Sequence, residues 1–448
     1  MSKTNGGAEK TLPRILIIGG GYVGMYTAHR ILKKLGKGEA LVTVVDPRSY
    51  MTYQPFLPEA AAGSLSPRHV VVPLRRVLKN AEVLTARVTD VDQDRKVATI
   101  EPIVGEPYEI EFDQLVVAVG SIARTLPIPG LAENGIGFKQ IEEAIALRNH
   151  VIGQLDIAAS TKDEKIRRRA LTFVFVGGGF AGVEAIAELE DMARDACKIY
   201  PNVSPDDMRW VMVEGSGRIL PEVRPALGEY TVRELEKRGI QVKLNTFLES
   251  CVNRRVQLSD GTKMVASTIV WTAGVKPNPV VQRFGIPLGE RGHVKANANL
   301  RVEGFDNVWA AGDGAQVPDL TDPEGKKFCS PSAQHAVRQA KTLAENVVAS
   351  VRGFEPRDYK HKHVGSVASL GLHKGVADVY NVRLRGWPAW FMHRTYHVSR
   401  VPTFNRKVRV IADWTLALFF RREAVGMGAI ERPREEFAEA AGDMRKAA

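Results

Sequence analysis

The sequence predicts an α/β fold with two Rossmann-like dinucleotide-binding domains, followed by a C-terminal amphipathic segment. Two stretches carry this expectation: LIIGGGYVGMYTAHRI, which starts at Leu16, and FVFVGGGFAGVEAIAEL, which starts at Phe173. Each consists of an apolar strand, a turn with three glycines and a helix of small residues, which is the unit that binds a dinucleotide phosphate. With 448 residues the chain has room for two or three domains.

Composition narrows the possible partners. The net charge of +11 favours an anionic partner such as a phosphorylated cofactor or an acidic membrane surface. Nucleic acid is not expected, because the basic residues lack an aromatic-interleaved or helix-turn-helix context. The cysteines Cys197, Cys251 and Cys329 are scattered, which excludes a paired redox motif and gives no zinc spacing. We therefore expect no metal.

We expect neither an export signal nor a membrane-spanning segment. Its start, MSKTNGGAEKTLPR, is polar and has no apolar core of the kind found in a signal peptide. No run approaches the ~20 apolar residues that cross a bilayer. The sparse cysteines fit a reducing compartment.

The first glycine turn follows a short β-branched run, Ile15 to Ile18, which is typical of a buried parallel strand. Gly19 makes the tight turn, Gly21 lets the backbone approach a pyrophosphate, and Gly24 lets the helix pack closely on the strand. The next apolar run, LVTVVD, ends in Asp46, where a carboxylate would hold a ribose hydroxyl. This pattern predicts a dinucleotide site.

The second glycine turn repeats the design. Its residues are Gly177, Gly179, Phe180, Ala181 and Gly182. The following strand, RWVMVEG, carries Glu214, and an acid there accepts bonds from the ribose hydroxyls and repels a 2′-phosphate, which favours NADH over NADPH. Arg218 lies close by in the sequence and would soften this discrimination. Two dinucleotide sites suggest FAD, held throughout turnover, and NADH, which comes and goes.

Three further segments, one between the two glycine turns and two after the second, each place small residues after an expected strand. They are FDQLVVAVGS, STIVWTAG and VWAAGDGAQV. The small residues of these turns are Ala118, Gly120, Ala273, Gly274 and Gly312. The first two segments would run the chain back past a cofactor. In the third, Asp313 is placed to hydrogen-bond the ribityl chain of FAD.

The order of these motifs, GxGxxG, AxGS, GxGxxG, TAG and AGD, resembles a flavoprotein pyridine-nucleotide reductase. Three segments are similar to the type II NADH dehydrogenases, the single-subunit NADH:quinone oxidoreductases. They are YQPFLPEAAAGSLSP, SAQHAVRQAKTLAENV and the aromatic, basic tail from Gly386 to Ala424. The resemblance implies a non-proton-pumping enzyme of the respiratory chain. Hydride would pass from NADH to FAD, and two electrons would then pass to a membrane quinone.

The resemblance also implies a division of the chain and a set of site residues. The FAD domain would occupy 12–140 and 291–355, with an NADH domain at 141–290 and a membrane-associating region at 356–448. Further flavin-binding residues would be Tyr22, Val23, Gln54, Pro55, Val88, Ala333 and Gln334. Catalytic residues would be Glu184 near nicotinamide and flavin, Gln334 and Gln339 near the quinone, and His335 as a candidate proton donor.

The sequence departs from the family pattern at two places. Arg338 stands where the first glutamine of a QQ pair is usual. Val364 stands where the family has a lysine near the flavin, and Lys362 or His363 would have to replace it.

The tail predicts a helix from Lys407 to Arg422 that lies on an anionic membrane surface. One side would carry Val410, Ile411, Trp414, Ala417 and Leu418. The basic residues that bracket it are Arg406, Lys407, Arg409, Arg421 and Arg422. Asp413 and the short apolar length argue against spanning, and Trp387 and Trp390 lie upstream, suited to the headgroup layer. We expect a peripheral protein on the cytoplasmic face of the cell membrane, and a homodimer.

Two other functions fit the same motifs. One is a soluble NAD(P)H-dependent flavin reductase that serves a protein or another non-quinone acceptor. The other is an NADH-sensing redox protein in which turnover is incidental. The tail favours the membrane enzyme, because a soluble reductase does not need an interfacial helix.

Overall fold

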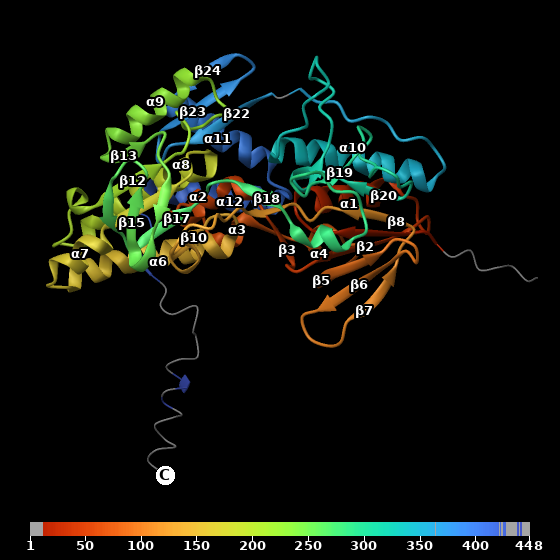
Figure 1. Ribbon diagram of the computed structural model, residues 1–448, viewed down its shortest axis with the longest axis horizontal. Helices are drawn as coiled ribbons and strands as arrows, with labels where there is room; N and C mark the ends of the chain where they lie inside the picture. Colours follow the sequence, from red (N-terminus) through yellow and green to blue (C-terminus); the bar gives the residue numbers. More distant parts are fainter. Residues whose placement is uncertain are drawn as a thin grey trace, which may run out of the picture.

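The computed structural model describes residues 12–362, 364–420, 422, 424–426, 437–438 and 440. The expectations for the N-terminal residues 1–11, for His363 and for Arg421 lie outside these residues. The chain forms two α/β halves side by side, and a smaller C-terminal sheet and two helices pack against them (Figure 1).

The first half is built on a seven-stranded sheet. Five of its strands run parallel, in the order β20-β8-β1-β2-β5. Strands β6 and β7 continue the sheet beyond β5 and are antiparallel. The strands are β20 (Val308–Ala310), β8 (Gln114–Val117), β1 (Arg14–Ile18), β2 (Leu41–Asp46), β5 (Glu82–Asp92), β6 (Val97–Pro102) and β7 (Tyr108–Glu111). The β-branched runs of β1 and β2 are buried because helices cover both faces of a parallel sheet.

The second half has a five-stranded parallel sheet in the order β10-β17-β11-β12-β13. Its strands are β10 (Gly135–Gly137), β17 (Thr268–Trp271), β11 (Thr172–Val176), β12 (Arg209–Val213) and β13 (Ile240–Lys243). This order matches that of the first sheet strand for strand, so each glycine turn leaves the middle strand of an equivalent sheet.

Each sheet has one edge strand that is separated in sequence from the rest of that half. The first sheet is completed by β20, which follows the whole second half in sequence. The second sheet is completed by β10, which precedes it. Residues 135–137 therefore pair within the second sheet, whereas the expected boundary at 140 assigned them to the first. A three-residue strand of sequence GIG has too little apolar pattern to show this in the sequence.

Twelve helices are seen in the described part of the chain. They are α1 (Tyr22–Lys34), α2 (Leu57–Ala61), α3 (Pro67–Val70), α4 (Leu74–Val77), α5 (Leu131–Asn134), α6 (Ile141–Ser160), α7 (Glu164–Ala170), α8 (Phe180–Ala196), α9 (Pro225–Glu236), α10 (Ala333–Val351), α11 (Trp387–Arg400) and α12 (Phe404–Phe419). The glycine turns lead into α1 and α8. Helix α10 packs along α1, so it returns the chain to the first half after the second has been built.

Short strands connect and extend the two halves. They are β3 (Tyr50–Thr52), β4 (Val71–Pro73), β9 (Ser121–Ala123), β14 (Leu248–Ser250), β15 (Arg255–Leu258), β16 (Lys263–Val265), β18 (Val275–Pro277), β19 (Val294–Lys295) and β21 (Ala315–Gln316). Strands β9 and β18 follow the two similar turns AVGS and TAG, and they pair antiparallel with each other. This pairing joins the two halves just beyond β8 and β17, the strands that neighbour β1 and β11 in their sheets.

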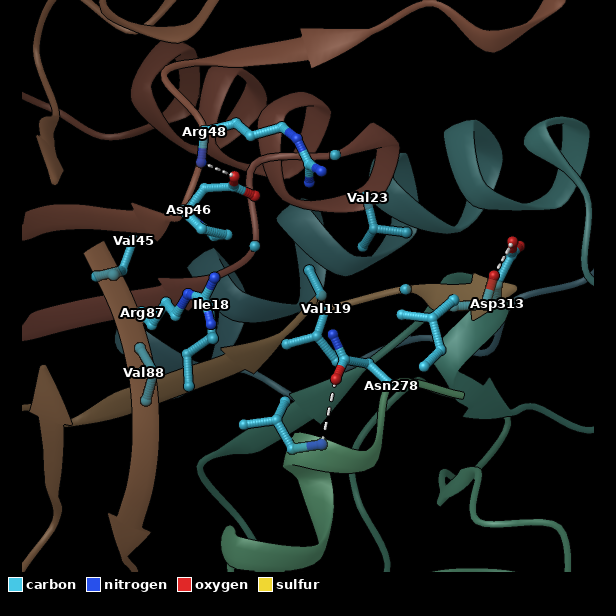
Figure 2. Close-up of a pocket in the computed structure, with 18 of the residues that line it drawn as sticks. Ile18, Val23, Val45, Asp46, Arg48, Arg87, Val88, Val119, Asn278 and Asp313 are labelled. Atoms are coloured by element: carbon cyan, nitrogen blue, oxygen red, sulfur yellow. Dashed lines mark hydrogen bonds between the residues drawn. The ribbon is translucent and has the colours of Figure 1, made fainter. Parts of the chain in front are cut away.

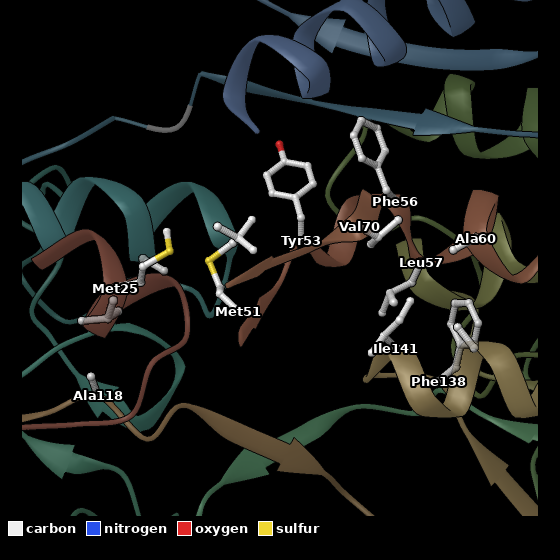
Figure 3. Packing of buried hydrophobic residues seen from close by; sticks show 14 of the residues in the cluster. Met25, Met51, Tyr53, Phe56, Leu57, Ala60, Val70, Ala118, Phe138 and Ile141 are labelled. Atoms are coloured by element: carbon white, nitrogen blue, oxygen red, sulfur yellow. The ribbon is translucent and has the colours of Figure 1, made fainter. Parts of the chain in front are cut away.

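The hydrophobic core is continuous across the two halves. Figure 3 shows Met51, Tyr53 and Phe56 leading from the first half toward Phe138 and Ile141 of the second. Most of these side chains are almost fully buried. The two halves therefore hold a fixed relation to each other.

The C-terminal region begins with a three-stranded antiparallel sheet of β22 (Gly365–Ser369), β23 (Gly375–Val379) and β24 (Val382–Arg385). Helix α11 packs on this sheet, and α12 returns toward α3 (Figure 1). The predicted helix 407–422 is present, but it begins and ends about three residues earlier, because the side chain of Thr403 caps Arg406 N at its start. No helix among the described residues is both long and apolar enough to cross a membrane.

Candidate functional site

The two glycine turns share one geometry. Gly19 and Gly177 have φ of +105° and +116°, a backbone region that favours glycine. A Cβ on Gly24 would lie 1.7 Å from the carbonyl oxygen of Gly19, and one on Gly182 would lie 1.9 Å from that of Gly177. Both helices therefore start against their own turn, with their first amides directed to an anion.

A carboxylate closes each turn. Oδ2 of Asp46 accepts a hydrogen bond from Gly20 N at 2.6 Å, and Oε2 of Glu214 accepts one from Gly178 N at 2.6 Å. Burial raises the pKa of Asp46. Both side chains stand where the sequence placed them, at the carboxyl ends of β2 and β12.

The guanidinium of Arg218 is already occupied. It donates to the carbonyl oxygens of Pro221 and Val223. It is therefore held by its own loop, and the expectation that it softens the preference set by Glu214 receives no support from its contacts.

A cavity of about 800 Å³ opens at the first turn. It is bounded by Asp46 and Arg48 on one side and by Asn278 and Asp313 on the other (Figure 2). Of the residues expected at the flavin, those in its wall are Gly19, Gly21, Tyr22, Val23, Asp46, Gln54, Val88, Ala118, Gly120, Asp313 and Ala333. A Cβ on Gly21 would meet nothing within 4 Å, so the turn leaves room for phosphate. This donor set and volume fit FAD.

Four of the expected flavin residues are not in the cavity wall: Gly24, Pro55, Gly312 and Gln334. Gly24 contacts the turn behind it, and a Cβ on Gly312 would lie 2.6 Å from Val23. Gln334 turns to the C-terminal region, where its Oε1 accepts from Val364 N at 3.0 Å and its Nε2 donates to Gly365 O at 3.2 Å. Gly24 and Gly312 therefore shape the backbone around the cavity, whereas Gln334 binds the C-terminal region.

Lys139 is a cavity residue that sequence reasoning missed. Its Nζ donates to Ser121 Oγ at 2.6 Å, and Ser121 donates to Asp313 Oδ2 at 2.9 Å. Burial lowers the pKa of Lys139. Lys362, expected as a substitute for the family lysine, is exposed. No local sequence motif predicts this role for Lys139, which lies in the irregular segment just before α6.

The α10 helix brings its amino end to the cavity through Ala333 and Ala336. Gln339 is buried, and its Oε1 accepts from Gly312 N at 2.7 Å, which fixes the turn after β20. His335 faces away, with Nδ1 2.9 Å from the hydroxyl of Tyr359. Its ring is also absent from the cavity wall, and its role as a proton donor stays a prediction.

Glu184 lies on α8, directly after the second turn, and is buried. Its Oε1 accepts from Ser369 N at 2.8 Å and lies 3.2 Å from Nε2 of His393 on α11. The C-terminal region therefore covers the start of α8 and supplies neighbours that the sequence did not indicate.

Helix α12 is fixed by buried polar groups. Glu59 Oε2 accepts from Trp414 Nε1 at 2.6 Å and from Arg394 Nη2 at 3.1 Å. Asp413 accepts from Ser66 N at 3.0 Å and lies 2.6 Å from His69 Nδ1. Asp413 thus serves as an internal anchor, which sequence reasoning had treated only as an obstacle to spanning.

The predicted apolar stripe of this helix is divided between two faces. Val410 is buried and Trp414 is half-buried against the protein, whereas Ile411, Ala417 and Leu418 are exposed. Trp390, expected at the headgroups, is also buried, and Arg394 lies 4.2 Å from its ring. The exposed apolar side chains of the two helices are Trp387, Phe391, Tyr396, Phe404, Val408, Ile411, Leu416, Leu418 and Phe419.

Among the described residues, no group of His, Cys, Asp and Glu side chains has the arrangement of a metal site. The three cysteines are free thiols.

Comparison with known proteins agrees with this architecture. The family model for pyridine nucleotide-disulphide oxidoreductases matches residues 13–340. The chain is 30% identical over 397 residues to the type II NADH:quinone oxidoreductase of Staphylococcus aureus (strain MSSA476), covering 87% of this chain and 95% of that protein. It is 27% identical over 421 residues to a probable NADH dehydrogenase of Dictyostelium discoideum, covering 92% and 90%.

A solved structure of NDH2 from Plasmodium falciparum, in complex with NADH, shares the fold. The TM-score is 0.85 at 20% identity, and the match covers 93% of this chain and 100% of the other. The predicted α/β fold with two Rossmann-type domains is thereby confirmed. By its motifs, its paired sheets and these relatives, the chain belongs to the pyridine nucleotide-disulphide oxidoreductase family and, within it, to the type II NADH:quinone oxidoreductases.

Proposed function

We propose that this chain is an NADH:quinone oxidoreductase that carries FAD, takes electrons from NADH and passes them to a membrane quinone without pumping protons. The observation that carries the proposal is the pair of equivalent dinucleotide turns on equivalent sheets. One turn opens into a flavin-sized cavity, and β9 and β18 join the two halves beside it.

The first half would hold FAD. Gly19 and Gly21 at the start of α1 would face the pyrophosphate, Asp46 the adenosine ribose, and Asp313 the ribityl chain. When bound, the flavin supplies the two-electron chemistry that links a hydride donor to a quinone. The protein supplies position and electrostatics. The amino end of α10, at Ala333 and Ala336, would stabilise negative charge at the flavin ring.

The second half would hold NADH. Gly177, Gly179 and the residues Phe180, Ala181 and Gly182 at the start of α8 would face its pyrophosphate, and Glu214 its ribose. Ala273 and Gly274 lie on the turn before β18, which pairs with β9 at the flavin side. By fixing its two dinucleotide sites relative to each other, the protein would supply the positioning that makes a reaction between two bound molecules effectively intramolecular. Glu184, at the start of α8, would orient the nicotinamide or take part in proton uptake.

The tail would dock the protein on the membrane surface, on the cytoplasmic face. The exposed apolar face of α11 and α12 is flanked by Arg406, Lys407 and Arg409. Apolar and aromatic side chains with neighbouring basic groups are the pattern of a helix that lies in the interface. The protein would therefore meet its quinone from the lipid side. A homodimer, with part of the same face shared between two copies, remains a prediction.

Anaerobic stopped-flow mixing tests the proposal. NADH should bleach the flavin of the purified holoprotein, and a soluble short-chain quinone should then restore its absorbance at a rate compatible with steady turnover. A reduced flavin that ferredoxin or oxygen reoxidises but quinone does not would favour the soluble reductase. Slow bleaching with a persistent charge-transfer band would favour the sensor.

A further inference from the structure

Two histidines, the buried His393 and the half-buried His397, lie one helical turn apart on α11 with their rings in contact. His393 is 1% exposed. Its Nε2 is 3.2 Å from Oε1 of Glu184 but out of line for a hydrogen bond, and Nδ1 has no hydrogen-bond partner among the described residues. The rings of His393 and His397 meet edge to face, with centroids 4.5 Å apart.

The pair continues toward the flavin cavity. Nδ1 of His397, which is partly buried, lies 3.3 Å from the hydroxyl of Tyr53, and this hydroxyl points toward α11 (Figure 3). The ring of Tyr53 is 6.1 Å from that of Tyr22, which lines the cavity. A line of ionisable groups thus runs from Glu184 beside the second turn to the wall of the flavin cavity.

Stability does not account for this line. A buried polar group without a well-formed hydrogen bond costs free energy, and apolar side chains of the same size would pack here without that cost. Buried ionisable groups gathered between two cofactor sites are instead typical of functional sites. Outside this line, the neighbours of the two rings are Phe56 from the first half and Tyr396 on α11.

The reaction of the proposed function needs a proton. NADH, one proton and quinone give NAD⁺ and quinol, so hydride supplies two electrons and one hydrogen, and the second hydrogen must arrive as a proton. On the basis of that proposed function, we propose that His393 and His397 relay this proton between Glu184 and Tyr53, toward the wall of the flavin cavity.

The charges around the pair suit this task. Burial, followed by the neighbouring His393, lowers the pKa of His397 well below its ordinary value. His397 is therefore neutral at pH 7 and releases a proton readily after receiving one. The groups that face the pair are Glu184 from α8, Tyr53 from the segment before α2, and Tyr396 from α11. A fixed cation near this line is Arg400 on α11, whose guanidinium lies 5.5 Å from the ring of Tyr396 and acts electrostatically on Tyr53.

Two oxidants separate proton delivery from electron transfer. The holoprotein and the variants His397→Gln and His393→Gln are reduced with NADH and then mixed with a soluble short-chain quinone or with ferricyanide, which takes electrons without protons. Reoxidation by quinone should slow by about a hundredfold, as for loss of a general acid. The slowing should increase with pH and be reversed in part by added imidazole. The rates of flavin reduction by NADH and of reoxidation by ferricyanide should stay within about twofold of those of the parent protein.

Two further variants keep the test sharp. Tyr53→Phe removes one hydroxyl, so it should still fold and slow only the quinone step if either histidine variant is unstable. Tyr396→Phe changes the ring that neighbours His397 at 5.1 Å and should leave both oxidants unaffected. Equal rates for all variants with quinone, or equal slowing with both oxidants, would overturn the relay. If quinone fails to reoxidise the parent protein, it is the proposed function that fails.

Discussion

Single atoms decide whether the first turn can hold a flavin. A Cβ on Gly24 would lie 1.7 Å from the backbone oxygen of Gly19, and backbone cannot move aside as a side chain does. Gly24→Ala should therefore push α1 off its turn, cost about 1–3 kcal/mol of stability and yield protein with little bound flavin. The flavin absorbance of the purified protein, measured per chain, checks this.

Gly153→Ala is the matched control. Gly153 lies inside α6, and a Cβ there would meet nothing within 4 Å. Alanine is the better helix former by about 1 kcal/mol. This variant should keep its flavin and unfold at the same or a higher temperature. Loss of flavin in both variants would mean that any added methyl group disturbs the fold, and the close approach at Gly24 would not be special.

We also expect one residue, Glu214, to set the choice between NADH and NADPH. The carboxylate of Glu214 accepts from Gly178 N and from Ser216 N at 2.7 Å, so its charge is fixed beside the second turn. Glu214→Gln removes the charge that repels a 2′-phosphate and keeps an acceptor oxygen. We expect the ratio of kcat/KM for NADPH to that for NADH to rise about tenfold, or about 1.4 kcal/mol. An unchanged ratio would place the discrimination elsewhere.

At the scale of elements, helix α12 has one face packed on the protein and one face exposed. Its inner face is anchored through Asp413 and Trp414 to the segment 59–69. Its outer face presents Leu418 and Phe419, which are 68% and 78% exposed. Exposed apolar side chains of this size have no folding role, so they are free to enter lipid.

Replacing both with serine should weaken binding to anionic vesicles. Each such side chain contributes about 1.5–3 kcal/mol when it is buried in an apolar phase. The double variant Leu418→Ser, Phe419→Ser should therefore bind at least roughly a hundredfold more weakly, measured by vesicle co-sedimentation with flavin content unchanged. The control is Ile103→Ser, Val104→Ser, which removes two exposed apolar side chains from the turn between β6 and β7. Equal loss in both would argue against a dedicated membrane face, and a change in oligomeric state alone would assign the outer face to a second copy.

At the scale of the whole molecule, the features that the sequence predicted are those formed by residues close together in the chain. The glycine turns, their strands and the carboxylates Asp46 and Glu214 follow from periodicity and spacing over fewer than about 40 residues. The cavity also needs Lys139 and Asn278, which only the packing of the two halves brings together. The faces of α12 were misjudged because apolar residues occur on both of its sides, and the sequence does not say which side meets the protein.

The burial of His397 against the first half predicts how the stability of the whole fold depends on acid. Burial lowers the pKa of His397, so below pH of about 6.5 the unfolded chain binds a proton there that the folded chain does not. The stability that neutral His397 allows is present above this pH and is lost as pH falls. Acidification from pH 7 to pH 5 should therefore destabilise the folded chain through this site.

Thermal unfolding of the holoprotein at pH 7 and pH 5 measures that loss, which His397→Gln should reduce. Glu188 works in the opposite direction, because burial raises its pKa and the folded chain keeps its proton more readily than the unfolded chain. Its contribution is present at low pH and fades as pH rises, so Glu188→Gln should enlarge the loss on acidification. A parent protein equally stable at both pH values, with neither variant changing the difference, would show that the C-terminal region opens before these groups titrate. The buried line from Glu184 to Tyr53 would then not be a fixed part of the folded molecule.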